Sequence, residues 1–168
     1  MTPRTSLAFS IHELLVTIAL ISIAASATLP ALSSLKQKSQ QEALRNALYT
    51  SLQNARAQAI LHRRSVELCA TSRNGACSNE WQNGWKSHFL APSQPTIDVH
   101  KASLGTPLHW SGFSKTIRFY SNGTSTISNG RFFQCHNNSI AWQLVINRQG
   151  RVRVTTASEN DGQAHRCQ

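Results

Sequence analysis

The feature that most constrains this chain is an uncharged run near its N-terminus. Leu14–Leu35 contains no acidic or basic residue over 22 positions, and Glu13 stands directly before it. As an α-helix the run would be about 33 Å long, at about 1.5 Å per residue, which matches the thickness of a bilayer core. Ser and Thr side chains interrupt it, and Ala25-Ser26-Ala27 has the small residues of a signal-peptide cleavage site. From these residues alone, two interpretations remain open: a cleaved signal peptide, or a retained helix in which Glu13 has a function.

A second helical segment follows the uncharged run. Apolar side chains recur there at spacings of three and four, at Leu44, Leu48, Leu52, Ala55 and Ala59. This period predicts an amphipathic helix from Lys36 to about Leu61. Basic side chains form a line on another face of this helix, which is most simply a solvated face; they are Lys38, Arg45, Arg56 and Arg63.

Beyond Arg64 the hydrophobic period becomes two, and the turns are rich in Gly, Asn and Pro, which is typical of short antiparallel strands. The expected strands are Ser65–Ala70, Gly84–Ala91, Lys115–Ser121, Arg131–Cys135, Ile140–Asn147 and Arg151–Thr156. Asn122-Gly123 and Asn129-Gly130 suit hairpin turns with positive φ. We therefore expect an α+β chain, with a long N-terminal helix packed on a β-rich head.

The residues around Glu13 resemble a known export signal. Leu7-Ala8-Phe9-Ser10-Ile11-His12-Glu13-Leu14-Leu15, followed by the apolar run, resembles the class III signal of type IV pilins and type II secretion pseudopilins. The resemblance implies that a prepilin peptidase cleaves between Ala8 and Phe9 and methylates the new N-terminus. It also implies that Glu13 pairs with the N-terminal ammonium of a neighbouring subunit during pilus assembly.

This resemblance divides the chain into four parts. Residues 1–8 would be the leader peptide, and residues 9–35 the transmembrane helix that later lies in the filament core. Residues 36–64 would be the amphipathic half of the same helix, and residues 65–168 the globular head. The implied fold is the type IV pilin fold.

Further segments narrow the resemblance to the FimT/GspH group of minor pilins. They are Arg56-Ala57-Gln58-Ala59-Ile60, Val66-Glu67-Leu68-Cys69, Trp81 with Gly84-Trp85, Ile117-Arg118-Phe119 and Gly150-Arg151-Val152-Arg153. The Gly-Arg-x-Arg segment is similar to a motif of FimT-like pilins that bind DNA for natural transformation. The resemblance thus implies a role in DNA uptake, with other major and minor pilins as partners.

The residues of that last segment suit a phosphate contact. Arg151 and Arg153 alternate with two valines, so both guanidinium groups should project from one exposed strand face. At about 3.3 Å per residue they would lie about 6.6 Å apart, close to the advance of about 6.8 Å over two base steps of a duplex. Gly150 would allow a tight turn into the strand, and Arg148 adds a cation on that turn. The alternative is a solvated edge strand whose charges prevent aggregation.

The distribution of charge points to the same region. The chain has 168 residues and a formal charge of +10. Residues 99–158 contain no acid and seven basic residues, Lys101, Lys115, Arg118, Arg131, Arg148, Arg151 and Arg153. Lys115, Arg118 and Arg131 are therefore weaker candidates for DNA contact, and the strand carrying the first two could lie beside the C-terminal strand. No base-reading helix is evident, so we expect phosphate-dominated, salt-dependent binding of double-stranded DNA.

Four cysteines allow three disulfide pairings, and an even number suits an oxidising compartment. We favour Cys69–Cys77, which closes a short loop, and Cys135–Cys167, which pins the C-terminal tail near the strands with the arginines. No CxxC spacing supports a zinc site instead.

Catalysis has little support in these residues. The histidines are scattered without paired-ligand spacing, the few acids form no obvious acid/base pair, and neither a nucleophile elbow nor a phosphate-binding loop is present. The four tryptophans are expected in the core rather than stacked on bases. We expect a protein that binds and assembles, with no enzymatic activity, no cofactor and no metal.

Together these observations predict a minor pilin that crosses the inner membrane once, has a periplasmic head, and is later displayed at the cell surface in a type IV pilus. There it would bind extracellular DNA. The alternative is a structural, GspH-like minor pseudopilin of a type II secretion system. A periplasmic protein that binds anionic lipids is a third possibility.

Overall fold

The computed structural model describes residues 10–72, 74–90, 95–101 and 107–168, without the side chains of residues 24 and 27–31. The chain divides into two compact units, Met1–Gln40 and Gln41–Gln168, which are described separately. One helix, α1 (Ile11–Leu61), contributes to both units. The expected cleavage site at Ala8 and Phe9 lies outside the described residues.

The first unit is the N-terminal part of α1. Glu13 lies exposed in the first turn of the helix. Large apolar side chains are exposed along the described positions, namely Ile11, Leu14, Leu15, Val16, Ile18, Leu20, Ile21, Ile23, Leu32 and Leu35. Across the described ranges, no helix reaches the combination of length and apolar character that a membrane crossing requires.

The second unit contains two antiparallel sheets. Sheet A has the order β2-β1-β3-β4, with β6 also paired to β1; sheet B has the order β5-β7-β8-β9. The strands of sheet A are β1 (Val66–Thr71), β2 (Cys77–Ser78), β3 (Gly84–Phe89), β4 (Thr96–Lys101) and β6 (Ile117–Phe119). Those of sheet B are β5 (His109–Gly112), β7 (Gly130–His136), β8 (Ser139–Ile146) and β9 (Val152–Val154). Three short helices complete the unit: η1 (Trp81–Asn83), α2 (Ala157–Asp161) and η2 (Ala164–Cys167).

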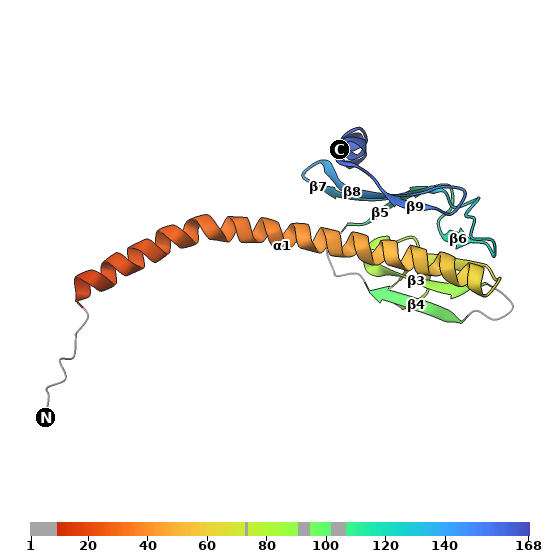
Figure 1. Cartoon of the computed structure of the whole chain (residues 1–168), viewed down its shortest axis with the longest axis horizontal. Coiled ribbons are helices and arrows are strands. Elements are labelled where there is room, and N and C mark those ends of the chain that lie inside the picture. Colours follow the sequence, from red (N-terminus) through yellow and green to blue (C-terminus); the bar gives the residue numbers. More distant parts are fainter. Residues whose placement is uncertain (1–9, 73, 91–94, 102–106) are drawn as a thin grey trace, which may run out of the picture. The chain divides into compact units, whose positions relative to one another are not determined.

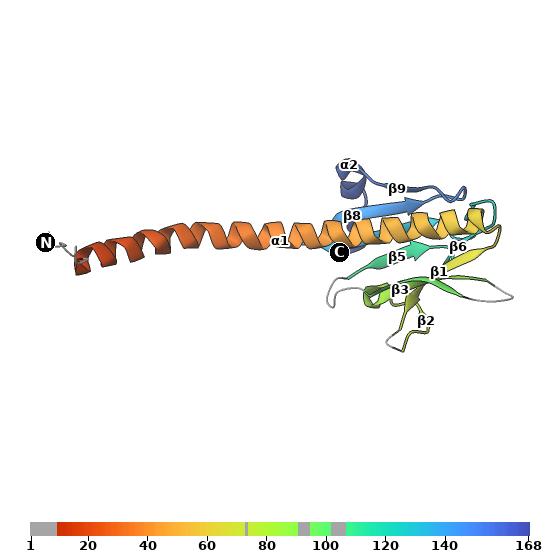
Figure 2. The ribbon, with the colours of Figure 1, turned by 60° about the horizontal axis from the view of Figure 1, so that its bottom comes forward.

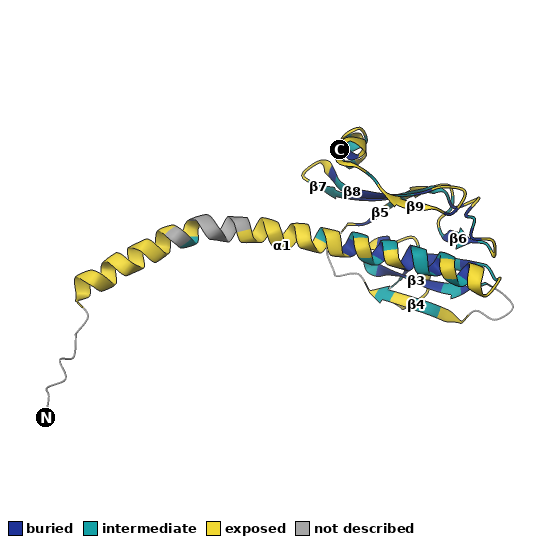
Figure 3. Ribbon diagram, viewed as in Figure 1, coloured by how far each residue is buried: buried dark blue, intermediate teal, exposed yellow. Residues whose placement is uncertain are grey.

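The C-terminal turns of α1 pack on both sheets. Strands β7, β8 and β9 of sheet B lie above this part of the helix in Figure 1 and β3 and β4 of sheet A below it, while Figure 2 shows β5 of sheet B on the same side of the helix as β1 and β3. The predicted apolar stripe faces this core, since Leu48, Leu52, Ala55 and Ala59 are fully buried. Figure 3 shows the buried positions recurring along this part of the helix. From sheet B, alternating apolar side chains of β8 enter the same core, namely Trp142, Leu144 and Ile146. Ile140, on the same strand, is also buried but lies outside this cluster. The predicted α+β architecture of a helix on antiparallel sheets is therefore confirmed.

The six predicted strands are present with shifted ends, and three further strands were missed. The missed strands are β2, β4 and β5. β2 has only two residues, which is too short for a periodic pattern. β4 directly follows Pro95, and a proline beside a short run of residues favours a loop rather than a strand. β4 and β5 are edge strands, where alternation is a weak signal because one side lacks a neighbour.

One of the two predicted Asn-Gly turns is wrong. Gly123 has φ of +77° and lies in a turn, as expected. Gly130 instead begins β7, where a Cβ would lie 2.7 Å from the Trp110 ring, so this glycine permits close packing. The tight β7–β8 connection uses Asn137 and Asn138, with φ of 49° and 58°. Paired positive φ values fit the twist of a two-residue hairpin.

Both expected disulfides are present. Cys69–Cys77 joins β1 to β2, and Cys135–Cys167 joins β7 to η2, each with 5.6 Å between the Cα atoms. The second bond holds the C-terminal segment on sheet B, whose strands β7 and β9 carry Arg131 and Arg153.

Candidate nucleic-acid interface

The expected DNA-binding segment forms the turn between β8 and β9. The Asn147 side chain accepts a hydrogen bond from the Arg151 backbone N–H at 2.9 Å, and the Asn147 N–H donates to the Arg151 carbonyl at 3.1 Å. Gly150 donates its N–H to the Asn147 carbonyl at 2.9 Å. These bonds close a compact turn, so residues 148 and 149 project from the end of sheet B.

Gly150 has a structural role that its sequence motif does not reveal. Its φ is +73°, a left-handed conformation in which any side chain is strained. A Cβ at this position would lie 2.1 Å from the carbonyl oxygen of Gly123, in the turn after β6. The glycine therefore allows the two turns to pack against each other.

Arg56, on α1, fixes these two turns together. Its Nε donates to the Gly123 carbonyl at 2.9 Å, and its Nη2 donates to the Gln149 carbonyl at 3.3 Å. The Ser125 N–H also donates to the Arg148 carbonyl at 2.9 Å. No sequence pattern indicates this role, because the partners of Arg56 lie 67 and 93 residues away. The turn is thus held by α1 and by the turn after β6 before any ligand binds.

Two arginines of this anchored turn are available to a ligand. Arg148 and Arg151 are exposed, and within the described ranges no hydrogen bond or ion pair engages either guanidinium group. Arg151 lies one residue before β9 and lines a groove of about 720 Å³ together with Arg153 and residues of α1. Arg148 lines a second groove of about 390 Å³ that also contains Arg131. Asn147 and Gln149 border both grooves, so the turn separates them.

Arg153 differs from Arg151 because its guanidinium group forms an ion pair with a carboxylate. Its Nη1 and Nη2 donate to the two oxygens of Glu159 at 2.9 and 2.7 Å. The two hydrogen bonds raise the pKa of Arg153 and, together with the Thr156 N–H, lower the pKa of Glu159 from 4.5 to about 2. Glu159 also completes the capping box of α2 with Thr156. Arg151 and Arg153, which were expected to be equivalent, therefore differ. Within the described residues Arg153 is paired with Glu159, whereas the Arg151 guanidinium group has no partner.

The weaker candidates separate into two regions. The expectation that the strand of Lys115 and Arg118 lies beside the C-terminal strand is wrong, because β6 pairs with β1 in sheet A. There Arg118 faces Glu67 directly and forms an ion pair with it at 2.9 Å. Arg131, in contrast, lies on β7 and shares the smaller groove with Arg148. The structure thus brings one of the three candidates to the turn.

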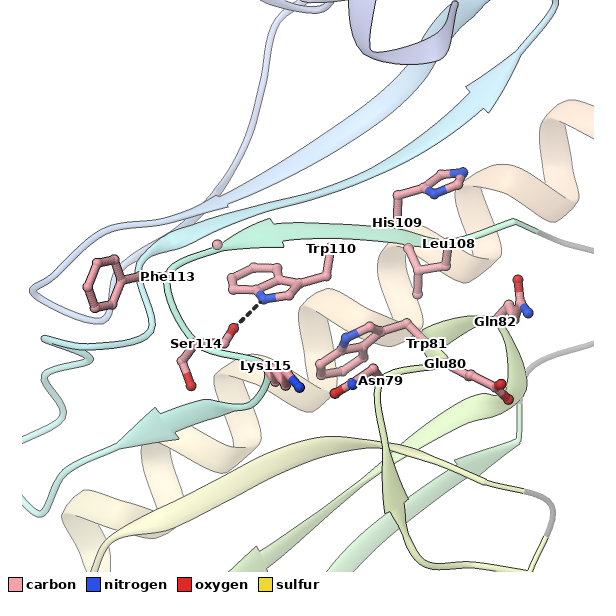
Figure 4. Close-up of a pocket in the computed structure, with 11 residues that line it drawn as sticks. Asn79, Glu80, Trp81, Gln82, Leu108, His109, Trp110, Phe113, Ser114 and Lys115 are labelled. Atoms are coloured by element: carbon pink, nitrogen blue, oxygen red, sulfur yellow. Dashed lines mark hydrogen bonds between the residues drawn. The ribbon is translucent and has the colours of Figure 1, made fainter.

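Lys115 borders a separate pocket of about 510 Å³ (Figure 4). Trp81 and Trp110 line this pocket, and the Trp110 Nε1 donates to the Ser114 carbonyl at 2.6 Å. Trp81, like Trp85 and Trp142, is almost fully buried. The expectation that these three tryptophans belong to the core is confirmed, and their ring faces are not open to bases.

One group of metal-ligand types occurs among the described residues. Potential ligand atoms of Cys69, Cys77 and His88 lie within 4.8 Å of one another. The two sulfurs are joined in a disulfide, so they are not thiolate ligands in this state. His88 has its pKa lowered mainly by burial, which disfavours the charged imidazolium.

Comparison with known proteins agrees with this fold. The family described as type II transport protein GspH matches residues 44–150. The chain is also similar to two crystal forms of the type IV minor pilin FimU of Pseudomonas aeruginosa strain PAO1. The first has 22% identity and a TM-score of 0.57, covering 73% of this chain and 92% of FimU. The second has 21% identity and a TM-score of 0.57, covering 70% and 94%. Comparison with curated proteins gave no match.

Proposed function

The chain belongs to the GspH family, and from this premise we propose that it is a minor pilin of a type IV pilus whose turn between β8 and β9 binds extracellular double-stranded DNA. Its coarser role is that of a minor pilin or pseudopilin, in a type IV pilus or a type II secretion system, which associates with other pilins. DNA capture is the finer proposal. The proposed function consists of DNA binding and assembly with other pilins, and it involves no catalysis.

The observation that carries this proposal is the state of Arg148 and Arg151. Both guanidinium groups are exposed and lack a carboxylate partner among the described residues, on a turn that Arg56 already holds in place. An anchored turn loses little conformational freedom on binding, so more of the interaction energy is available for affinity. Guanidinium groups without internal partners are suited to bind phosphate oxygens.

The proposed sequence specificity is low. Cationic side chains at a turn and an edge strand contact the phosphate backbone, which carries little sequence information. Binding of this kind releases counterions and weakens steeply as salt rises. Many weak contacts along one filament would compensate for a weak single site, since linked sites act together.

The proposal includes the path to the cell surface. We propose that prepilin peptidase cleaves after Ala8, that Phe9 is methylated, and that residues 9–35 hold the protein in the inner membrane before assembly. Glu13, exposed in the first turn of α1, then pairs with a neighbouring subunit. The two disulfides suit a head that folds in an oxidising compartment. N-terminal sequencing of the mature protein and its extraction from membranes by alkaline carbonate test these steps.

DNA binding is tested with the full chain in a non-ionic detergent and a fluorescent 30-base-pair duplex of arbitrary sequence. The test variant is R148Q/R151Q, because Arg153 is already paired. Loss of two phosphate contacts should weaken binding about 60-fold at 0.1 M salt and lower the slope of log K against log salt by about two. The charge-matched control is K101Q/K115Q, which removes two exposed lysines that lie outside sheet B and outside the turn between β8 and β9. Equal binding by the test and control variants would refute DNA capture at this turn.

A structural pseudopilin is the second candidate, and the description of the matching family favours it. On this alternative the head contacts other pseudopilins or exported proteins, and the arginines serve those contacts. R148Q/R151Q would then retain the weak DNA binding of the control but would fail to restore secretion in a strain that lacks the gene.

A further inference from the structure

A row of residues crosses the outer face of sheet B. The strand registers pair Ser111 with Arg131, Arg131 with Val145, and Val145 with Arg153. Directly paired residues lie on the same face of a sheet. Neighbouring strands lie about 4.8 Å apart, so the row is about 14 Å long from β5 to β9. It therefore places Arg131 near the middle of the sheet and Arg153 at its edge.

The C-terminal segment adds a third arginine at the other end of the row. Arg166 is exposed on η2, next to Cys167, whose disulfide with Cys135 holds η2 at the sheet. Its Nη1 donates to the Ser111 hydroxyl at 3.3 Å, and its Nε donates to the Gln163 side chain at 2.8 Å. Arg131 lies between this end and Arg153. Sequence reasoning missed Arg166 because only the disulfide and the fold bring it to this face.

The charges in this row are incompletely neutralised. Arg131 donates to the neutral Gln143 side chain at 3.3 Å, and Glu159 is occupied by Arg153. Within the part of the chain that the structure describes, no ion pair engages Arg131 or Arg166. Burial lowers the pKa of Arg131, and the charges of Arg166 and Arg153 lower it further, against a smaller opposite effect of Glu159. These like charges repel each other, and an anion bound among them would relieve that repulsion.

The row is continuous with the proposed DNA-binding turn. Arg131 and Val145 line the same groove as Arg148 and Gln149. Three residues along an extended chain separate Val145 from Arg148, or about 10 Å. This leg runs along the strand, whereas the leg of about 10 Å from Val145 through Arg131 to Ser111 runs across the strands, so the two ends of the path lie about 14 Å apart, or roughly four base pairs at about 3.4 Å each. One duplex could contact its whole length.

We propose that Arg131 and Arg166 form a second phosphate-binding position on the outer face of sheet B, which extends the DNA path from the turn between β8 and β9 towards β5. This inference rests on the proposed function, because it assigns further residues to the same ligand. The ligand chemistry is a series of phosphodiester groups at regular spacing. The C-terminal disulfide contributes by holding Arg166 at this face.

The test compares R131Q and R166Q with K101Q, in the full chain in non-ionic detergent with the same 30-base-pair duplex. Each of the first two variants should bind about eightfold more weakly at 0.1 M salt and reduce the salt slope by about one. K101Q should stay within about twofold of the wild type, because Lys101 lies on sheet A and distant charges are screened at this salt concentration. R131K, which keeps the charge, should retain most of the slope.

R148Q/R151Q is measured alongside, so that the two proposals fail separately. If it weakens binding while R131Q and R166Q match K101Q, the second position is wrong and the turn alone binds DNA. If R131Q and R166Q weaken binding while R148Q/R151Q does not, the second position stands and the turn is not the site. If all variants match their controls, both proposals are wrong.

Two further measurements distinguish DNA contact from a loss of fold and from lipid binding. Thermal unfolding of each variant identifies a loss of fold, which matters most for R131Q because its side chain is half-buried; R166Q alters an exposed side chain of the last helical turn. Vesicles with one third anionic phospholipid replace DNA in a parallel titration. Stronger binding to these vesicles than to DNA, lost in R131Q and R166Q, would identify the face as a lipid site and overturn the proposal.

Discussion

Sheets A and B both carry arginines, but the charges have different surroundings. In sheet A, Arg118 faces Glu67 across β6 and β1, and the side chains are 36% and 14% exposed. On sheet B and its turn, Arg148 and Arg151 have no carboxylate partner among the described residues, whereas Arg153 is paired. Residues 99–158 contain no acid, but their arginines are not all unpaired, because the carboxylates that pair with them lie outside this stretch. Glu67 lies 51 residues before its partner, and Glu159 lies six residues after its own.

The difference separates a structural arginine from a binding arginine. A half-buried guanidinium group beside a carboxylate stabilises the packing of two strands, and a phosphate would have to displace the carboxylate to bind. An exposed guanidinium group without a partner gives up only water when it binds a phosphate. The two sheets can therefore be compared by substitutions that have the same chemistry in each.

The largest expected effect concerns the disulfides, because one of them holds the C-terminal segment on sheet B. C135A/C167A should lower the free energy of unfolding by about 3.7 kcal/mol and C69A/C77A by about 2.5 kcal/mol, since the cross-links close loops of 32 and 8 residues. Urea denaturation of both variants measures the difference. A larger loss in C69A/C77A would show that sheet A depends more on its cross-link than sheet B does.

Gly150 and Gly75 allow a matched comparison of two turns. Their φ values are +73° and +79°, but a Cβ on Gly75 would meet no atom within 4 Å, whereas one on Gly150 would meet a backbone oxygen. G75A should therefore lose about 1 kcal/mol of unfolding free energy, from conformational strain alone, and G150A about 3 kcal/mol. G150A should also weaken DNA binding, because Arg148 and Arg151 would move with the turn. Equal losses of stability would mean that the turns of Gly123 and Gly150 are not in contact.

The two ion pairs should differ in their contribution to stability. R118Q leaves the Glu67 carboxylate, which is mostly buried, without its cation, and should cost about 1–2 kcal/mol after allowance for solvent at Arg118. R153Q breaks an exposed pair and should cost less. Thermal unfolding ranks the two variants, and DNA titration provides the control, since R118Q should bind DNA like the wild type. A greater loss of stability in R153Q would contradict the assignment of Arg118 as the structural arginine.

The smallest expected effect tests whether Glu159 competes with DNA for Arg153. E159Q should raise DNA affinity a few-fold at pH 7, because it frees one guanidinium group; a glutamine can still accept the capping hydrogen bond of α2. An unchanged or lower affinity would show that Arg153 does not contact DNA.

The same substitution has an effect on acid stability. The pKa of Glu159 is lowered from 4.5 to about 2 in the folded chain, so its stabilising contribution is complete above pH 4.5 and is lost as the pH falls towards 2. The stability of the wild type should therefore fall more steeply over this range than that of E159Q. Unfolding curves at pH 5, 3.5 and 2.5 measure the difference, and parallel curves would contradict it.

Much of the fold could be predicted from local patterns. The helical spacing of Leu48 and Leu52, and the alternation of Trp142 and Leu144, each report which face of an element is apolar, and both faces are in the core. The disulfide pairing was also predicted. The failures have a common cause, which is that a local pattern does not report contacts with a neighbouring strand. Gly130 resembles a turn residue, but it permits contact with the Trp110 ring of the neighbouring strand. Edge strands such as β4 and β5 carried too little periodicity to be found.

The sequence by itself determined the family, the helix with its apolar stripe, the β-rich head and the concentration of basic residues before Glu159. Those properties depend on composition and on neighbours along the chain. Only the tertiary structure decided which arginines are available. Strand register pairs Arg118 with Glu67, Arg56 spans 67 and 93 residues to anchor two turns, and a disulfide brings Arg166 to sheet B. The physical reason is that an ion pair depends on distance in space, which the register and the cross-links set.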